Sequence, residues 1–221
     1  MDKKFSASIA CASIVDIRDS IEKLNHSVDF LHIDLMDNHF VKNLGFSYDQ
    51  IADIRKLSNL PFDFHLMVDN PENVLDKSII REGDMVSIHI EAVFDFEDMT
   101  KKIKDLGARV LLALNPMVPI KCIEIVADLI DGINYLTVNP GFASQVQTDI
   151  AKIQAANIGS FIKENKREKF IFEVDGNMTL KNIEIFSSFG ANCFVLGTSS
   201  IFPNNKLNID QLREIVKLKD K

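Results

Sequence analysis

The stretch Phe5-Ser6-Ala7-Ser8-Ile9-Ala10-Cys11-Ala12-Ser13 holds the first apolar run and the turn that follows it, and it decides between two α/β architectures. An open, doubly wound sheet usually carries a Gly-rich G-x-G-x-x-G turn at this point. The turn Ile9-Ala10-Cys11-Ala12-Ser13 contains no glycine. Its composition therefore favours the closed alternative, a (β/α)8 barrel.

Short apolar runs recur along the chain, and each is followed by an amphipathic stretch. We predict strands over residues 5–10, 28–33, 61–66, 85–90, 109–114, 132–138, 169–174 and 192–196. Between them, apolar residues recur at helical steps in three groups: Ile14, Ile17, Ile21 and Leu24; Ile120, Ile123, Ile125 and Leu129; and Ile150, Ile153, Ile158 and Ile162. Eight such units without a linker predict an α/β protein, a (β/α)8 TIM barrel with a single domain over residues 1–221.

The composition is that of a soluble globular protein. Apolar residues make up 46% of the chain, which argues against disorder. The formal net charge of −7 argues against nucleic-acid or membrane-surface binding, but a small anionic ligand needs only a few local donors. The three cysteines form no CxxC pair, no apolar run approaches a membrane span, and the first residues do not resemble a secretory signal. We expect a cytoplasmic protein without disulfides.

Four residues at predicted strand ends could hold a divalent metal ion. His32 and Asp34 are two residues apart, so a strand points both side chains to one side. His65 ends the third strand and Asp175 the seventh, and a barrel brings these ends to one mouth. Each residue alone is more often a hydrogen-bonded core or turn residue. The four together predict a metal site.

Other histidines and methionines lie close to this set. His39 is expected in a loop and His26 at a helix end, and the sequence leaves open whether His89 lines the same mouth. Met36 and Met67 each stand two residues beyond a candidate ligand. Methionines usually pack in a core, but these two would lie above the metal and exclude water from it.

Turns rich in small residues come late in the chain. They are Asn139-Pro140-Gly141-Phe142-Ala143-Ser144-Gln145, Asp175-Gly176-Asn177 and Gly197-Thr198-Ser199-Ser200. The loops after strands 7 and 8 of such barrels often bind phosphate through backbone N–H groups, although ordinary strand-to-helix turns use the same residues. No G-x-x-x-x-G-K-[ST] motif points to a nucleoside triphosphate.

These residues, in this order, resemble the ribulose-phosphate 3-epimerase family. The matching stretches are Ser8-Ile9, His32-Ile33-Asp34-Leu35-Met36-Asp37-Asn38-His39-Phe40-Val41 with Asn43-Leu44, His65-Leu66-Met67-Val68, Asn115-Pro116, Val138-Asn139-Pro140-Gly141-Phe142, Glu173-Val174-Asp175-Gly176, and Gly197-Thr198 with Ile201-Phe202. They run from residue 8 to residue 202 and cover nearly the whole chain. No single stretch is specific, but the set is.

The resemblance implies a set of roles for these residues. One divalent ion (zinc, iron, manganese or cobalt) would be held by His32, Asp34, His65 and Asp175, and Asp34 and Asp175 would be the acid/base pair. The phosphate would lie at Gly176-Asn177 and Gly197-Thr198. The other expected substrate contacts are Ser8, His65, Met36, Met67, Gly141, Phe142, Ala143 and Ser144. The family's members associate, so a homo-oligomer is expected.

The sequence departs from the usual family pattern at a few positions. Ala143, Ser144 and Asn177 replace glycines, and Leu136 replaces a methionine. Cys11, Ala143, Asn177 and Gly197-Thr198-Ser199 look more like the allulose-6-phosphate 3-epimerase branch. These changes leave the metal and acid/base set intact and leave the length of the sugar open.

The resemblance implies an enzyme, an isomerase that inverts C3 of a ketose phosphate. Two-base proton transfer through a metal-stabilised enediolate would convert D-ribulose 5-phosphate to D-xylulose 5-phosphate, or D-allulose 6-phosphate to D-fructose 6-phosphate. One alternative is a phosphosugar decarboxylase or aldolase, but Asp34-Leu35-Met36-Asp37 lacks the lysine of the related decarboxylases. Another is a non-catalytic sugar-phosphate-binding barrel.

Overall fold

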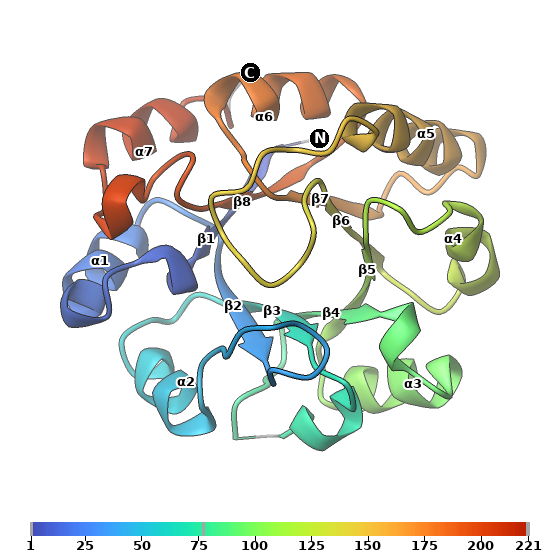
Figure 1. The fold of residues 1–221 in the computed structure, drawn as a ribbon, viewed down its shortest axis with the longest axis horizontal. Helices are drawn as coiled ribbons and strands as arrows, with labels where there is room; N and C mark the ends of the chain where they lie inside the picture. The colour runs from blue at the N-terminus through green and yellow to red at the C-terminus, as the bar shows by residue number, and fades with distance from the viewer. Residues whose placement is uncertain (1, 77, 220–221) are drawn as a thin grey trace.

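The computed structural model describes residues 2–76 and 78–219, and its centre is a closed barrel of parallel strands (Figure 1). The strands are β1 Lys4–Ser8, β2 Phe30–Met36, β3 Phe62–Met67, β4 Met85–His89, β5 Arg109–Leu114, β6 Gly132–Leu136, β7 Ile171–Asp175 and β8 Cys193–Leu196. Each strand pairs with its neighbours in sequence order, and β8 pairs with β1, which closes the barrel. The predicted (β/α)8 TIM barrel fold is therefore confirmed.

Helices form a ring around the barrel (Figure 1). They are α1 Ile17–Leu24, α2 Tyr48–Arg55, α3 Phe96–Asp105, α4 Lys121–Val126, α5 Ala151–Glu164, α6 Leu180–Ser188 and α7 Ile209–Val216. Short 3₁₀ helices cover Ile9–Cys11, Ile14–Asp16, Pro71–Val74, Ile90–Ala92 and Pro203–Asn205. Several helices begin at a side-chain cap; at α2, Ser47 and Gln50 form a reciprocal capping box.

All eight predicted strands are present, but the expectation of eight full strand–helix units is wrong for the third unit. Between β3 and β4, the described residues form one short 3₁₀ helix, Pro71–Val74, and no α-helix. Ile79 and Ile80, which follow it, are buried and pack in the core without belonging to a helix.

Three residues of the predicted helical faces are exposed, so those faces were assigned incorrectly. Ile14 is 60% exposed, Ile125 79% and Ile153 63%. Ile14 precedes the first turn of α1. Ile125 lies two residues from the buried Ile123, and two residues correspond to about 200° around a helix. Ile153 has the same relation to the buried Ala151 of α5.

The barrel interior changes from apolar to polar along its axis. Phe30, Met85, Leu111 and Cys193 form a small apolar cluster near the amino ends of the strands. Elsewhere in the interior, fully buried polar side chains on β1, β2, β3, β4, β6 and β7 alternate with apolar residues that pack outward against the helices: Ser6, His32, Asp63, Ser87, Asn134 and Glu173. Burying such polar groups is costly unless they are paired. Their partners are therefore to be looked for toward the carboxyl ends of the strands.

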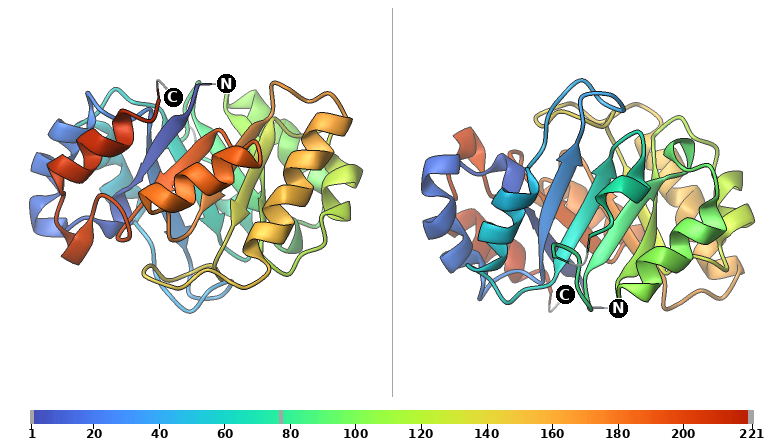
Figure 2. Two further views of the ribbon diagram at one scale, coloured as in Figure 1. Left: turned by 90° about the horizontal axis from the view of Figure 1, so that it is seen from above. Right: turned by 90° about the horizontal axis from the view of Figure 1, so that it is seen from below.

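The loops after β2 and β6 extend from one end of the barrel (Figure 2). β1 begins and α7 ends at the opposite end in both side views. Within the described residues, the helices are all too short or too polar to cross a lipid bilayer. In (β/α)8 barrels, ligand sites lie at the carboxyl ends of the strands, and the long loops after β2 and β6 mark this end.

Candidate active site

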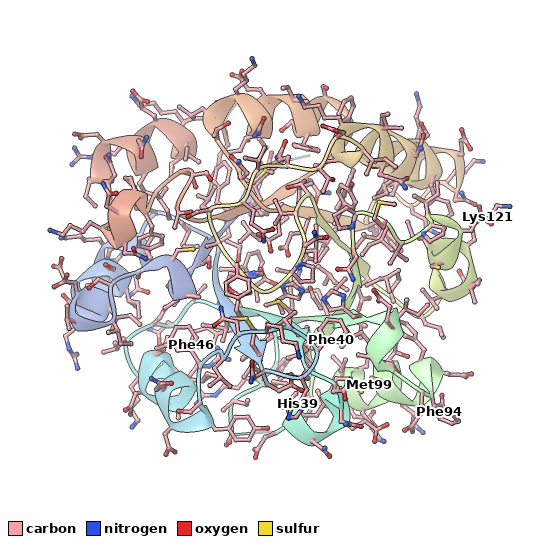
Figure 3. The ribbon with its side chains drawn as sticks, viewed as in Figure 1. His39, Phe40, Phe46, Phe94, Met99 and Lys121 are labelled. Carbon is pink, nitrogen blue, oxygen red and sulfur yellow. The ribbon has the colours of Figure 1, made fainter. Side chains whose placement is uncertain are left out.

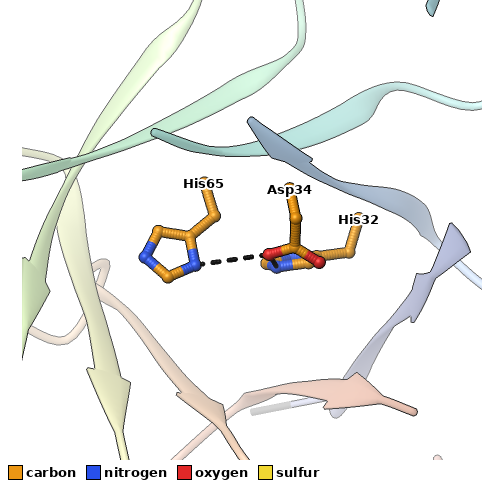
Figure 4. A group of neighbouring side chains, drawn as sticks. All are labelled: His32, Asp34 and His65. Atoms are coloured by element: carbon orange, nitrogen blue, oxygen red, sulfur yellow. Dashed lines mark ion pairs between the residues drawn. The ribbon is translucent and has the colours of Figure 1, made fainter. Parts of the chain in front are cut away.

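Four side chains from three strands converge at the carboxyl end of the barrel. Asp34 Oδ1 on β2 lies 3.4 Å from His32 Nε2 and 3.5 Å from Nδ1 of His65 on β3. Asp175 Oδ2 on β7 lies 4.0 Å from the same His32 nitrogen and 3.9 Å from the same His65 nitrogen. Figure 4 shows His32, Asp34 and His65 with their donor atoms facing one another. The structure thus brings all four predicted ligands together.

Strand geometry explains this convergence. On β2 the residues Leu31, Ile33 and Leu35 pack in the outer core, so the alternate residues His32 and Asp34 face the interior. Strands β2 and β3 pair with Asp34 opposite His65, which places these two side chains at one level. Asp175 is the last residue of β7 and reaches the same level from across the barrel.

The two histidines present nitrogens that suit a metal ion. His32 Nε2 and His65 Nδ1 are buried and, among the residues that the structure describes, have no hydrogen-bond partner. Both atoms face the carboxylates of Asp34 and Asp175. Two imidazole nitrogens and two carboxylate oxygens form a donor set that zinc, iron, manganese and cobalt accept. The residues therefore fit one divalent cation.

The surroundings shift the two carboxyl groups in opposite directions. Burial opposes ionisation of Asp34, but the charge of His32 and the proximity of both His32 and His65 outweigh it, so the pKa of Asp34 lies well below its ordinary value. Burial raises the pKa of Asp175 above its ordinary value, although His32 acts against this shift. Paired groups with separated pKa values are the usual arrangement of a base and an acid. A bound cation would lower both pKa values.

A buried carboxylate holds the far side of the His32 ring. Asp63 Oδ2 lies 2.6 Å from His32 Nδ1 and also accepts a 2.7 Å hydrogen bond from Ser6 Oγ. Glu173 lies beside Asp63, and burial together with the Asp63 charge raises the pKa of Glu173 well above its ordinary value. The sequence reasoning missed Asp63 and Glu173. The signal was available, because each lies two residues before a predicted ligand, His65 or Asp175, and so faces the same side of its strand.

His89 on β4 occupies the corresponding place behind His65. Their Nε2 atoms lie 2.9 Å apart, and the two rings are stacked with centroids 5.1 Å apart. Phe40, which Figure 3 shows beside the barrel opening, packs on His89 at 4.7 Å between ring centroids. His89 is fully buried. It therefore contacts the predicted ligand His65 from behind and does not line the mouth, which answers a question that the sequence left open.

One pocket above this cluster collects the other predicted site residues. Its lining includes Ser8, Asp34, Met36, His65, Met67, Gly141, Phe142, Ala143, Ser144, Asp175, Gly176, Asn177, Gly197 and Thr198, and also Cys11 and Leu136. His32 lies beneath the pocket and is fully buried. His39 lies in the loop after β2, as expected, and His26 follows the end of α1. The predicted substrate contacts thus share one cavity.

The loop after β6 is held over this pocket by other loops. Asn43 Nδ2, from the loop after β2, donates a 2.7 Å hydrogen bond to the Gly141 carbonyl. Asn177 Nδ2, from the loop after β7, donates to the Gln145 carbonyl at 2.9 Å. The hydroxyl oxygens of Ser144 and Thr198 lie 2.9 Å apart. Residues from three neighbouring loops therefore fix the position of this segment.

Gly176 shows why the loop after β7 needs a glycine at this position. Its φ of +103° is in the left-handed region. A Cβ at this position would lie 2.7 Å from Thr137 Oγ1, whose hydroxyl donates to the Gly176 carbonyl. Any side chain would be strained and crowded, so the backbone at this point stays open to the pocket.

Comparison with known proteins gives one family. The model of the ribulose-phosphate 3-epimerase family matches residues 4–202. A ribulose-phosphate 3-epimerase from Buchnera aphidicola subsp. Baizongia pistaciae is 34% identical over 97% of this chain and 97% of its own length. Another from Methanocaldococcus jannaschii is 34% identical over 96% of this chain and 90% of its own length.

Solved structures with low sequence identity share the fold. Orotidine 5'-phosphate decarboxylase from Pyrococcus horikoshii superposes with a TM-score of 0.68 at 12% identity, covering 98% of this chain and 99% of that one. A mutant tryptophan synthase alpha-subunit from Pyrococcus furiosus has a TM-score of 0.64 at 11% identity, and the match covers 100% of this chain and 98% of that one. At this identity, the likeness concerns the barrel alone.

Proposed function

The chain belongs to the ribulose-phosphate 3-epimerase family and is an isomerase that acts on carbohydrates, and on this premise we propose that it inverts C3 of a ketose phosphate. The candidate substrates are D-ribulose 5-phosphate and D-allulose 6-phosphate. One observation carries the proposal: Asp34 and Asp175 come from opposite sides of the barrel and approach the same two histidine nitrogens. Two carboxyl groups so placed can serve the two faces of one sugar carbon.

The proposed cofactor is one divalent metal ion held by His32, Asp34, His65 and Asp175. When bound, such an ion supplies Lewis-acid stabilisation to the oxygens next to the reacting carbon. The two histidines and two aspartates fix its place at the floor of the pocket. Their partners Asp63 and His89 hold the rings from behind.

The two aspartates perform the proton transfers in this proposal. The C2 carbonyl acidifies the C3 proton, and Asp34, with its lowered pKa, is ionised and accepts this proton as a base. Asp175, which approaches from the other side of the site, delivers a proton to the opposite face of C3. Inversion requires two groups, since one group alone returns the proton to the face from which it came.

The remaining pocket residues orient the substrate and exclude water. Met36 and Met67 line the pocket with thioethers that offer no proton to a planar enediolate. The loops with Gly176-Asn177 and Gly197-Thr198 supply backbone N–H groups and a hydroxyl for the phosphate. Phosphate bound away from C3 holds the reacting carbon between the two aspartates.

Further predictions from the sequence accompany this proposal. We propose that residues 1–221 act as one domain, that the protein is cytoplasmic and a homo-oligomer, and that its ligand is a small sugar phosphate and neither nucleic acid nor membrane. The alternatives from the sequence are a non-catalytic sugar-phosphate-binding barrel and a phosphosugar decarboxylase or aldolase, and no lysine is among the described residues that line the pocket. Turnover measurements separate these alternatives from the epimerase.

The direct test compares the two substrates on one purified sample. Protein loaded separately with Zn²⁺, Fe²⁺, Mn²⁺ or Co²⁺ is assayed with ribulose 5-phosphate and with allulose 6-phosphate, and the C3 epimer is identified by NMR. We expect inversion of at least one substrate, with loss on chelation and recovery on readdition of the metal. Binding of both sugars without inversion would support the non-catalytic alternative.

A further inference from the structure

Asp63 is a buried carboxylate outside the proposed ligand set, and it contacts one ligand directly. Its side chain is fully buried, and its Oδ2 lies 2.6 Å from His32 Nδ1. Ser6 Oγ donates to the same oxygen at 2.7 Å. Asp63 therefore contacts the nitrogen of His32 that faces away from the pocket.

The contact has a consequence for the other ring nitrogen. A neutral imidazole carries its proton on one nitrogen and a lone pair on the other. An ionised carboxylate can only accept hydrogen bonds, so Asp63 favours the tautomer with the proton on Nδ1. The lone pair is then on Nε2, the atom that faces Asp34 and Asp175.

We infer that Asp63 is a positioning residue, which fixes the ring orientation and the tautomer of His32 so that Nε2 can bind the divalent cation. This inference rests on the proposed function, because it presumes a cation at that point. Outer carboxylates of this kind commonly orient metal-binding histidines, and their loss typically weakens metal binding about 10–100-fold.

His65 provides an internal contrast. It faces the same point through Nδ1, and its Nε2 is 2.9 Å from Nε2 of His89, a neutral side chain that replaces the carboxylate. Each of the two rings thus presents a different nitrogen and has its own supporting residue. Removing the carboxylate of Asp63 should therefore weaken the binding of the cation by His32 and leave its binding by His65 unchanged.

The experiment measures metal affinity directly. Co²⁺ is titrated into wild-type protein and into Asp63→Asn in competition with a chromophoric chelator, and the visible absorption of bound Co²⁺ is recorded. Asparagine keeps the shape of Asp63, but its NH₂ can donate to Nδ1 and favour the tautomer with the proton on Nε2. We expect Asp63→Asn to bind Co²⁺ about 10–100-fold more weakly and to change the Co²⁺ spectrum.

Two control variants separate positioning from general structural damage. Ser6→Ala removes a hydrogen bond to Asp63 but leaves the contact between Asp63 and His32, so its affinity should stay within about twofold of wild type. Asp131→Asn makes the same chemical change at the residue before β6, where Asp131 Oδ2 accepts from the Val110 N–H at 2.8 Å. We expect wild-type Co²⁺ affinity for Asp131→Asn.

The outcomes distinguish this inference from the proposed function. If wild-type protein binds Co²⁺ and folded Asp63→Asn binds it equally well with an unchanged spectrum, Asp63 has no positioning role, while the metal site stands. If wild-type protein binds no divalent cation, the proposed metal site itself fails. If Asp63→Asn does not fold, ¹⁵N NMR of Zn²⁺-loaded wild type decides: a proton on His32 Nδ1 supports the inference, and a proton on Nε2 overturns it.

Discussion

The Nε2 atoms of His65 and His89 lie 2.9 Å apart, so one of these nitrogens must donate the shared proton and the other must accept it. The opposite nitrogen of His65 faces the carboxylates of Asp34 and Asp175. If His65 binds a cation through Nδ1, its Nε2 carries the proton and donates to His89. Burial, with the nearby His65, lowers the pKa of His89 well below its ordinary value, which keeps His89 neutral and able to accept.

This arrangement predicts different results for two substitutions at His89. His89→Phe leaves the buried Nε2–H of His65 without an acceptor, so we expect about a 10-fold loss of metal affinity. His89→Gln offers a carbonyl oxygen and should recover part of that loss. Calorimetric titration with Zn²⁺ checks that His89→Gln binds the metal more tightly than His89→Phe. Equal affinity of the two variants would show that an acceptor for the His65 Nε2–H is unimportant.

The contact between Ser144 and Thr198 predicts an effect on binding and not on the proton transfers. Their hydroxyl oxygens lie 2.9 Å apart, and both residues line the pocket. Thr198→Val keeps the shape of the side chain and removes its hydroxyl. The lost hydroxyl is the proposed donor to the substrate phosphate, and a hydrogen bond to a charged group contributes about 1.5–3 kcal/mol. We therefore expect KM to rise roughly 10-fold with little change in kcat. Inhibition by inorganic phosphate should weaken in parallel, whereas a fall in kcat alone would contradict a phosphate role.

A buried ion pair at the other end of the barrel predicts a loss of stability without a loss of chemistry. Arg55 Nη2 lies 2.5 Å from Asp84 Oδ2, and the guanidinium carbon is 3.4 Å from the Phe62 ring centroid. Asp84→Asn leaves the Arg55 charge without its partner, so unfolding in urea should require about 3–5 kcal/mol less free energy. The matched control Asp53→Asn breaks the exposed pair with Lys56 and should cause no measurable change. Equal effects of the two substitutions would contradict this assignment.

Asp29 predicts how stability depends on pH. Burial opposes ionisation of this residue, but hydrogen bonds from Lys219 and from the Phe5 N–H, with Lys4 nearby, outweigh it and lower the pKa of Asp29. Because the folded-state pKa is lowered, the stabilisation is fully present above the unfolded-state pKa of about 3.9 and is lost as the pH falls through the folded-state pKa. Asp29→Asn should cost about 1 kcal/mol at pH 6 and progressively less below pH 4. A cost that does not change with pH would contradict this account.

The sequence was sufficient to predict the barrel and the four converging residues, and the reason is strand periodicity. His32 and Asp34 alternate with outward-facing isoleucine and leucine, so their common direction follows from a strand alone. The 3₁₀ helix in the third unit did not follow from the sequence, because the expectation of a helix there rested on the regular alternation of the other units.

The sequence does not show which residues hold the histidines and the loops in place. Asp63 faces the same side of β3 as His65, but this spacing does not show which nitrogen of which ring it contacts. The connection between Ser144 and Thr198 joins two loops 54 residues apart, and loop conformations carry no periodic signal. Contacts across the barrel depend on register and on ring orientation, which the structure supplies.

The measurement that most directly tests the two-face assignment is hydrogen exchange at C3 by Asp175→Asn in D₂O, with metal content confirmed. We predict that epimerisation is abolished, while the epimer whose C3 hydrogen faces Asp34 still exchanges that hydrogen with solvent and the other epimer does not. Epimerisation at the wild-type rate by Asp175→Asn would contradict the account, and so would equal exchange from both epimers.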